Sequence, residues 1–230
     1  AFSLVASFIY PTWILPIFNK FSSLEDGALR TAIFTYADSV GFPLNNVFVM
    51  DGSKRSTRSN AYFTGFGKSR RIALFDTLIE SHEVNELVGV MAHEVGHYKK
   101  RHILKNTVMS IAYFGGLCYL LSIALNSEIL FRAFGVSLPS VYVGLVLFGV
   151  LFTPVSFVLS VLMNGLSRRY EFEADRYAVQ TTGDPESLAR ALATLSRTNL
   201  SNLTPHALYV WLTYSHPPVL ERIREIRSQS

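Results

Sequence analysis

Residues 91–100 read MAHEVGHYKK, and this stretch predicts the central helix of the chain and its chemistry. Apolar residues recur at helical spacing through and before it, which predicts an amphipathic helix over residues 82–105. These apolar positions are Val84, Leu87, Val88, Met91 and Val95. His93 and His97 lie four residues apart, so both imidazoles project from one face of that helix. That face is turned away from the apolar stripe.

Two imidazoles at this spacing can bind one Zn²⁺ ion, and Glu94 supplies a carboxylate beside it. Bound zinc lowers the pKa of its water toward about 7, and Glu94 can then pass a proton to a leaving amine. The H-E-x-x-H pattern also arises by chance on helix surfaces. Here the strong prediction of a helix supports the metal-binding interpretation of the motif. Gly96 supports it too, because a residue without a side chain lets a backbone or a substrate come close.

A third metal ligand is available in residues 167–179, SRRYEFEADRYAV. Hydrolytic zinc sites take three protein ligands and leave the fourth position open. Glu171 and Asp175 share one helical face, so we expect Glu171 to bind the metal and Asp175 to hold the N–H of a ligand histidine. Glu173 is the rival ligand, although Arg169 favours a solvated ion-pair face for it. The alternative for the whole segment is a charged helix end leaving a membrane.

Two uncharged, apolar runs lie between these motifs, over residues 107–126 and 133–167. A bilayer core of roughly 30 Å needs about 20 helical residues, so each run is long enough to span a membrane. The second run exceeds one span, so an interfacial turn is expected before Pro139 and a kink at Pro154. Two core helices of a soluble protein are the alternative, but the second run is too long for that. Residues 1–20 read as the end of a membrane or interfacial helix.

The composition agrees with a membrane protein and excludes several other classes. Of 230 residues, 49% are hydrophobic and 17% are charged, which excludes a disordered chain. Cys118 is the single cysteine, which excludes an intramolecular disulfide and multi-cysteine metal clusters. The net charge of +4 is mild, and the sequence contains no basic, aromatic module of the kind that binds nucleic acid.

Two spans return the chain to the side where it started, so His93 and His97 before them can meet Glu171 after them. Basic residues gather on that side: Lys99, Lys100, Arg101, Lys105, Arg168 and Arg169. The charged residues of the loop between the two runs are only Glu128 and Arg132. By the positive-inside rule, the metal side is therefore expected to be cytoplasmic.

The rest of the chain predicts a small sheet and further helices. Strands are expected over residues 45–52, 60–67 and 70–76. Helices are expected over residues 24–38, 168–181, 184–197 and from Pro217 onward. The fold class is therefore mostly α with a small sheet (α+β). We divide the chain into a helix end (1–20), a first catalytic part with the sheet and the H-E-x-x-H helix (21–106), a transmembrane hairpin (107–167) and a second catalytic part with the third ligand (168–230).

Three further stretches carry a family resemblance: PTWILPIFNKF (11–21), NAYFTGFGKSRRIALFDTL (60–78) and SHPPVLER (215–222). With H-E-x-x-H, two spans and E-x-x-x-D, the chain resembles the integral-membrane zinc metalloendopeptidases of the CAAX prenyl protease and HtpX family. It resembles the CAAX prenyl protease branch most. The resemblance implies a gluzincin-type peptidase domain set on membrane helices, with one Zn²⁺ per chain. Full-length members have further spans, so the chain is expected to be a C-terminal portion.

The resemblance assigns roles to the residues of the metal motif. His93, His97 and Glu171 match the zinc ligands of the family, and Glu94 matches its catalytic glutamate. Asp175 matches the acidic residue that orients a ligand.

The resemblance also implies substrate contacts. The strand from Asn60 through Ala61 and Tyr62 matches an edge strand that pairs with an extended substrate through main-chain hydrogen bonds. His216 matches a donor to the oxyanion formed in the reaction. Arg222 matches a residue that pairs with a buried carboxylate or with a substrate's terminal carboxylate. A helix cap and a surface charge are the alternatives for these last two.

The substrate stays open between a prenylated CAAX-type C-terminus and a segment of a damaged membrane protein, as in HtpX-like quality control. The implied partners are a peptide or protein substrate and the lipid bilayer, and not nucleic acid. A multi-pass location is expected, in the endoplasmic reticulum of a eukaryote or the inner membrane of a bacterium.

Two alternative functions of other classes are less well supported by the sequence. A non-catalytic membrane scaffold that retains a zinc site is disfavoured by the intact Glu94. A transporter is disfavoured because neither span contains a charge. His82, His102 and His206 are expected to be solvated or structural, with His102 near lipid headgroups.

Overall fold

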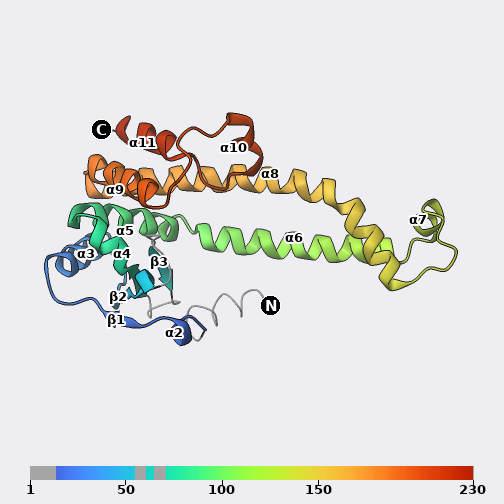
Figure 1. The fold of residues 1–230 in the computed structure, drawn as a ribbon, viewed down its shortest axis with the longest axis horizontal. Helices are drawn as coiled ribbons and strands as arrows, with labels where there is room; N and C mark the ends of the chain where they lie inside the picture. Colours follow the sequence, from blue (N-terminus) through green and yellow to red (C-terminus); the bar gives the residue numbers. More distant parts are fainter. Residues whose placement is uncertain (1–13, 55–60, 65–70, 230) are drawn as a thin grey trace.

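Residues 14–54, 61–64 and 71–229 are described by a computed structural model (Figure 1). Helices dominate, with one small sheet, which confirms the prediction of a mostly α fold with little strand. Two long helices, α6 (His102–Leu125) and α8 (Val141–Thr182), run side by side. The sheet and most of the other described helices gather around one end of this pair, and the short helix α7 lies at the other end.

The sheet has four strands among the described residues: β1 (Phe21–Ser23), β2 (Asn46–Met50), β3 (Ala61–Thr64) and β4 (Arg71–Phe75). Their order is β1-β2-β4-β3, with β2 and β4 parallel and both outer pairs antiparallel. The strands predicted over residues 45–52, 60–67 and 70–76 contain β2, β3 and β4. The prediction misses β1, which is too short to show a period. Strand β3 lies at one edge of this sheet.

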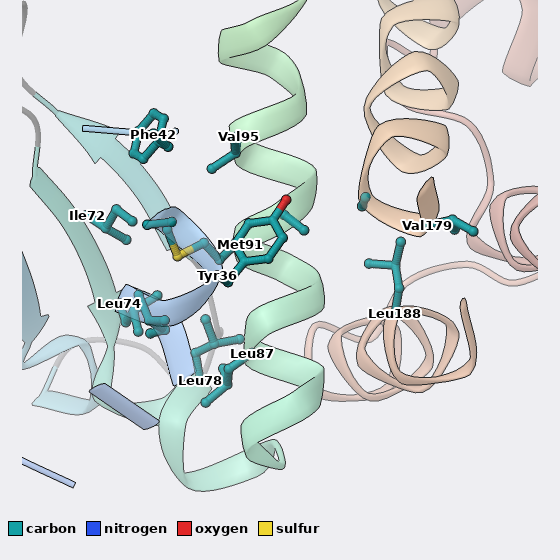
Figure 2. Close-up of a cluster of buried hydrophobic side chains, with 14 of the residues drawn as sticks. Tyr36, Phe42, Ile72, Leu74, Leu78, Leu87, Met91, Val95, Val179 and Leu188 are labelled. Atoms are coloured by element: carbon teal, nitrogen blue, oxygen red, sulfur yellow. The ribbon is translucent and has the colours of Figure 1, made fainter. Parts of the chain in front are cut away.

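Helix α5 (Val84–Lys99) lies at the centre of the fold (Figure 2). Its side chains Leu87, Met91 and Val95 are buried and face the sheet, where they join Leu74 of β4 in one apolar cluster. Helix α3 (Ala28–Ser39) also packs on α5. The short helix α4 (Asp76–Ser81) follows β4 directly. The apolar stripe read from the sequence therefore includes the side chains that α5 packs toward the sheet.

The opposite side of α5 packs against α8 and α9 (Pro185–Thr198). Figure 2 shows Val179 and Leu188 on that side. The predicted start of α9 is confirmed: Pro185 is its first residue, and Asp184 caps it by accepting a hydrogen bond from the Ser187 amide.

Two short helices complete the chain, α10 (Ala207–Thr213) and α11 (Val219–Arg227). Both pack on α8, and α11 also packs on α9. The prediction misses α10. Helix α11 begins two residues after Pro217, because Pro218 serves as its N-cap.

The prediction of one continuous helix over residues 82–105 is wrong. Helix α5 ends at Lys99, and α6 begins at His102 after a break. Arg101 interrupts the helix, because it adopts a left-handed conformation with φ of 58°. The break separates the helix that carries the histidine pair from the first long apolar helix.

Helix α8 combines two predicted elements in one. The short helix α7 (Glu128–Ala133) and the residues up to Pro139 precede it, so the predicted turn stands before the second apolar helix. From Val141 the helix runs unbroken for 42 residues, and the expected helix over 168–181 is its C-terminal part. Pro154 lies inside it, and Figure 1 shows α8 bending in its yellow section, as predicted for that proline.

Both α6 and α8 are long and apolar enough to cross a bilayer, by length and composition. Their large apolar side chains are mostly exposed, including Phe114, Leu120, Val146 and Phe157. Exposed side chains of this kind need an apolar medium or a partner. A membrane setting for the two helices accounts for this surface.

Helices α5 and α8 meet backbone to backbone at Gly96. A Cβ atom at this position would lie 3.0 Å from both Cα and the carbonyl oxygen of Ala174, and 3.2 Å from Cβ of Tyr177. Of the two uses suggested for this glycine, the structure shows the approach of a backbone. The contact places His93 and His97 opposite the turn of α8 that carries Glu171.

We expect Gly96→Ala to lower the free energy of unfolding by about 1–2 kcal/mol, because overpacking a backbone contact outweighs the gain in helix propensity. Gly165→Ala, also in a helix, is the matched control. Its Cβ would lie 3.7 Å from Arg168 Nη2, an ordinary contact, so stability should stay level or rise. Denaturant unfolding in mixed micelles, followed by circular dichroism, measures both. Equal shifts in the two variants would contradict a tight α5–α8 contact.

Candidate metal centre and active site

Three side chains from two helices converge on one point. His93 and His97 come from α5, and Glu171 comes from α8. The two Nε2 atoms lie 3.1 Å apart. Nε2 of His93 lies 3.5 Å from Oε2 of Glu171, and Nε2 of His97 lies 3.4 Å from its Oε1. Among the described residues, these three form the group that could hold a metal ion.

The arrangement fits a tetrahedral metal ion. Ligand atoms on bonds of about 2.1 Å to a tetrahedral zinc lie about 3.4 Å from one another. The separations of 3.1, 3.4 and 3.5 Å agree with this. The Nδ1 atom of each ring bonds elsewhere, to Asp175 from His93 and to His102 from His97. Both Nε2 lone pairs are therefore available at the same point, where they repel each other unless a cation lies between them.

Asp175 and Arg222 stand behind His93. Oδ1 of Asp175 lies 2.8 Å from Nδ1 of His93, and the carboxylate is fully buried. Arg222 donates to Asp175 through Nε at 2.7 Å and Nη2 at 2.6 Å, and its Nη1 lies 3.2 Å from Oε2 of Glu171. Of the two partners suggested for Arg222, the structure shows the buried carboxylate. This guanidinium faces inward, with 11% of its side chain exposed.

Burial and neighbouring charges shift the pKa values of Glu94 and Arg222 in this cluster. Burial raises the pKa of the Glu94 carboxyl, against the opposing charges of His93 and His97. A carboxylate with raised proton affinity is a better base near neutral pH. Burial alone would lower the pKa of Arg222, but the hydrogen bonds and charge of Asp175, with the charge of Glu171, raise it. Arg222 therefore stays charged in this setting.

His216 lies on the open side of the cluster. Its Nε2 is 3.4 Å from Oε1 of Glu171, while 66% of its side chain is exposed. Arg168 fixes the preceding segment, because its guanidinium donates to the carbonyls of Val210, Trp211 and Tyr214 at the end of α10. The site therefore has one exposed imidazole beside the buried cluster.

Glu173 forms the ion pair with Arg169 that the sequence suggested, whereas His102 lies in an unexpected place. The expectation that His102 contacts lipid headgroups is wrong, because its residue is 2% exposed. Its Nδ1 lies 3.0 Å from Nδ1 of His97, and its Nε2 lies 3.2 Å from Oε2 of Glu173. Glu173 also accepts from Arg169, so this rival ligand points away from the metal cluster. An unbroken helix would place His102 on the opposite face from His97, so helical spacing held no signal for this contact.

The other predicted positions divide into three groups. Asn60 lies outside the described residues. Ala61 and Tyr62 belong to β3, whose backbone pairs antiparallel with β4 at the edge of the sheet and lies close to α5. His82 bonds to backbone carbonyls and His206 caps α10, so both are structural, as expected.

Comparisons with known proteins agree on one family. The profile of peptidase family M48 matches residues 23–230. A CAAX prenyl protease 1 homolog from Arabidopsis thaliana is 43% identical, over 97% of this chain and 53% of that protein. CAAX prenyl protease 1 from Saccharomyces cerevisiae is 39% identical, over 96% of this chain and 52% of that protein. The chain thus spans about half the length of the curated relatives it matches.

A solved structure is also similar. The crystal structure of S. mikatae Ste24p superposes with a TM-score of 0.87 at 39% sequence identity. The match covers 98% of this chain and 56% of that one. The arrangement of helices and sheet described above is therefore shared with a solved fold.

Removing the Arg222 charge should strongly destabilise the protein. Arg222→Met leaves the buried Asp175 and Glu171 carboxylates without their cation, and losses of this kind cost about 3–5 kcal/mol. Arg227→Met in the same helix is the control. It breaks an ion pair with Glu186 in which the two side chains are 57% and 49% exposed, so we expect little change in Tm. Thermal unfolding in detergent measures both, and a small shift for Arg222→Met would refute its structural role.

Proposed function

The chain belongs to peptidase family M48, and from this membership we propose that it carries the catalytic centre of a membrane zinc endopeptidase. The convergence of His93, His97 and Glu171 next to Glu94 is the observation that supports this most directly. A group of three candidate ligands leaves a fourth position for water or substrate, as in hydrolytic zinc sites. A scaffold that used zinc only for structure would have no need of Glu94.

Zinc fits the nitrogen and oxygen donors of this cluster, and we propose that His93, His97 and Glu171 hold one ion per chain. When bound, zinc supplies a Lewis acid that acidifies water and polarises a carbonyl group. Asp175 keeps the proton of His93 on Nδ1, so the Nε2 lone pair stays available. Arg222 balances part of the charge of Asp175 and Glu171.

The proton transfers are assigned to Glu94. Its carboxylate takes a proton from the attacking water and then delivers it to the nitrogen of the leaving amine. Burial raises the pKa of this carboxyl, which favours both steps near neutral pH. His216 is close enough to the cluster to donate a hydrogen bond to the negative charge that develops on the substrate carbonyl.

We propose that an extended peptide substrate pairs with β3. The strand lies at the sheet edge next to α5, so main-chain hydrogen bonds can hold a peptide in register beside the cluster. Asn60, which precedes the strand, is proposed to hold a substrate carbonyl. Binding through the backbone sets the position of cleavage with little demand on side chains.

The substrate we propose is a prenylated polypeptide with a CAAX-type C-terminus. Relatives of 36–43% identity are named CAAX prenyl proteases, which supports this class over damaged membrane proteins. We propose a multi-pass location in the endoplasmic reticulum membrane with the site facing the cytosol. The relatives from plant, yeast and human sources and the basic residues at the site end of the helix pair support this placement.

Replacing Glu94 separates metal binding from catalysis. Glu94→Gln should keep about one zinc per chain but lower kcat by at least about 10²-fold, because the base is lost while the ligands remain. Glu221→Gln, at an exposed carboxylate of α11, is the control and should keep full activity. Metal analysis and peptide cleavage by the detergent-purified protein test both. Zinc binding without cleavage by wild type would favour the scaffold.

The prenyl group should decide substrate preference. We expect a farnesylated peptide ending in C-a-a-X to be cleaved with kcat/KM at least about tenfold above the same peptide without the lipid, because burying two or three CH₂ groups already accounts for that factor. Both peptides are compared in one detergent, with product release followed by mass spectrometry. Equal cleavage, together with cleavage of unfolded membrane-protein segments, would support the quality-control alternative instead.

A further inference from the structure

His97, His102 and Glu173 form a chain of hydrogen bonds, and only one assignment of donors and acceptors fits it when a metal binds His97. Nε2 of His97 faces His93 and Glu171 at 3.1 and 3.4 Å, so a metal there uses its lone pair and leaves the ring proton on Nδ1. That N–H points at Nδ1 of His102, 3.0 Å away, which must act as the acceptor. His102 then carries its own proton on Nε2 and donates it to Oε2 of Glu173 at 3.2 Å.

We propose that His102 and Glu173 are positioning residues of the metal site. Glu173 fixes the tautomer of His102, and His102 fixes the tautomer and ring orientation of His97. The inference rests on the proposed function, because it assigns a task around a zinc ligand. Partners of this kind orient ligand imidazoles and raise their basicity.

The two ligand histidines thus receive the same support by different routes. His93 contacts its carboxylate, Asp175, directly at 2.8 Å. His97 reaches its carboxylate, Glu173, through the ring of His102. Both carboxylates belong to α8, where Glu173 and Asp175 are two residues apart. This one helix therefore supports both imidazoles of α5.

The intervening ring is held firmly. His102 is 2% exposed and stacks on Tyr170, with ring centroids 4.2 Å apart and an interplanar angle of 13°. Glu173 is fixed in turn by Arg169, whose Nε donates to it at 3.0 Å. Rotation of His102 away from His97 would break these contacts, so its acceptor nitrogen stays in place.

The break between α5 and α6 makes this contact geometrically available. In an unbroken helix, five residues advance by about 500°, which would place His102 roughly 140° around the helix from His97. The left-handed Arg101 interrupts the helix and returns His102 toward His97. A non-glycine residue in this conformation is energetically costly, which agrees with a contact that the fold needs.

Two substitutions at His102 isolate the acceptor. His102→Phe keeps a ring against Tyr170 but offers no acceptor to His97, whereas His102→Asn keeps an acceptor oxygen near the Nδ1 position and loses the ring. Both lose the bond to Glu173. We expect the zinc Kd, measured by competition with a chromophoric chelator, to rise about 10–100-fold in His102→Phe and less than about fivefold in His102→Asn. A role in packing alone predicts the opposite order.

Independent controls separate this inference from the proposed function. Wild type and Glu94→Gln are titrated with zinc in the same way, and both should bind it equally. If wild type binds no zinc, the proposed function fails and takes this inference with it. If wild type binds zinc and cleaves peptide but His102→Phe binds zinc as tightly as His102→Asn, only the inference is overturned.

A second pair of variants tests the proposal should His102→Phe not fold. Glu173→Leu changes a partly exposed side chain and removes the partner that orients His102. Glu186→Leu is the control, because it removes a partly exposed carboxylate that pairs with Arg227 instead of a histidine. We expect Glu173→Leu to weaken zinc binding by at least about threefold and Glu186→Leu to leave it unchanged. Equal affinities in these two variants overturn the proposal.

Discussion

The close approach of α5 and α8 at Gly96 is the contact on which the site depends. The carbonyl and Cα of Ala174 occupy the space that any side chain at Gly96 would need. Because the two backbones touch there, ligand atoms from both helices come within 4.8 Å of one another. A separation larger by one methyl group would move Glu171 away from the histidine pair.

Charge balance explains why Arg222 lies beside the acidic residues of the site. The carboxylates of Glu171 and Asp175 pair with one largely buried guanidinium, that of Arg222, and the charge of Glu94 also acts on it. One cation does not balance three carboxylates, and a divalent ion reduces the excess. Arg222 therefore joins α11 to the carboxylates of α8 next to the candidate metal site.

Membrane and site are connected through the same helix. Helix α8 begins as an apolar, exposed helix and ends as the buried element that carries Glu171, Glu173 and Asp175. The acidic residues of this helix have separate tasks because successive residues turn by about 100°. Glu171 faces the histidine pair, Asp175 faces His93 and Arg222, and Glu173 faces His102.

Elements whose signal is local could be predicted from the amino-acid sequence alone. Four patterns predict the helices and the candidate ligands: the apolar period of α5, the H-E-x-x-H spacing, the acidic residues at i and i+4, and the two apolar runs. Each pattern depends only on residues within one helical turn or one membrane span. The partner of Gly96, the inward orientation of Arg222 and the contact of His102 with His97 became visible only in the tertiary structure. These depend on how α5, α6, α8 and α11 pack, and on one left-handed residue, Arg101, which carries no sequence signal for that conformation.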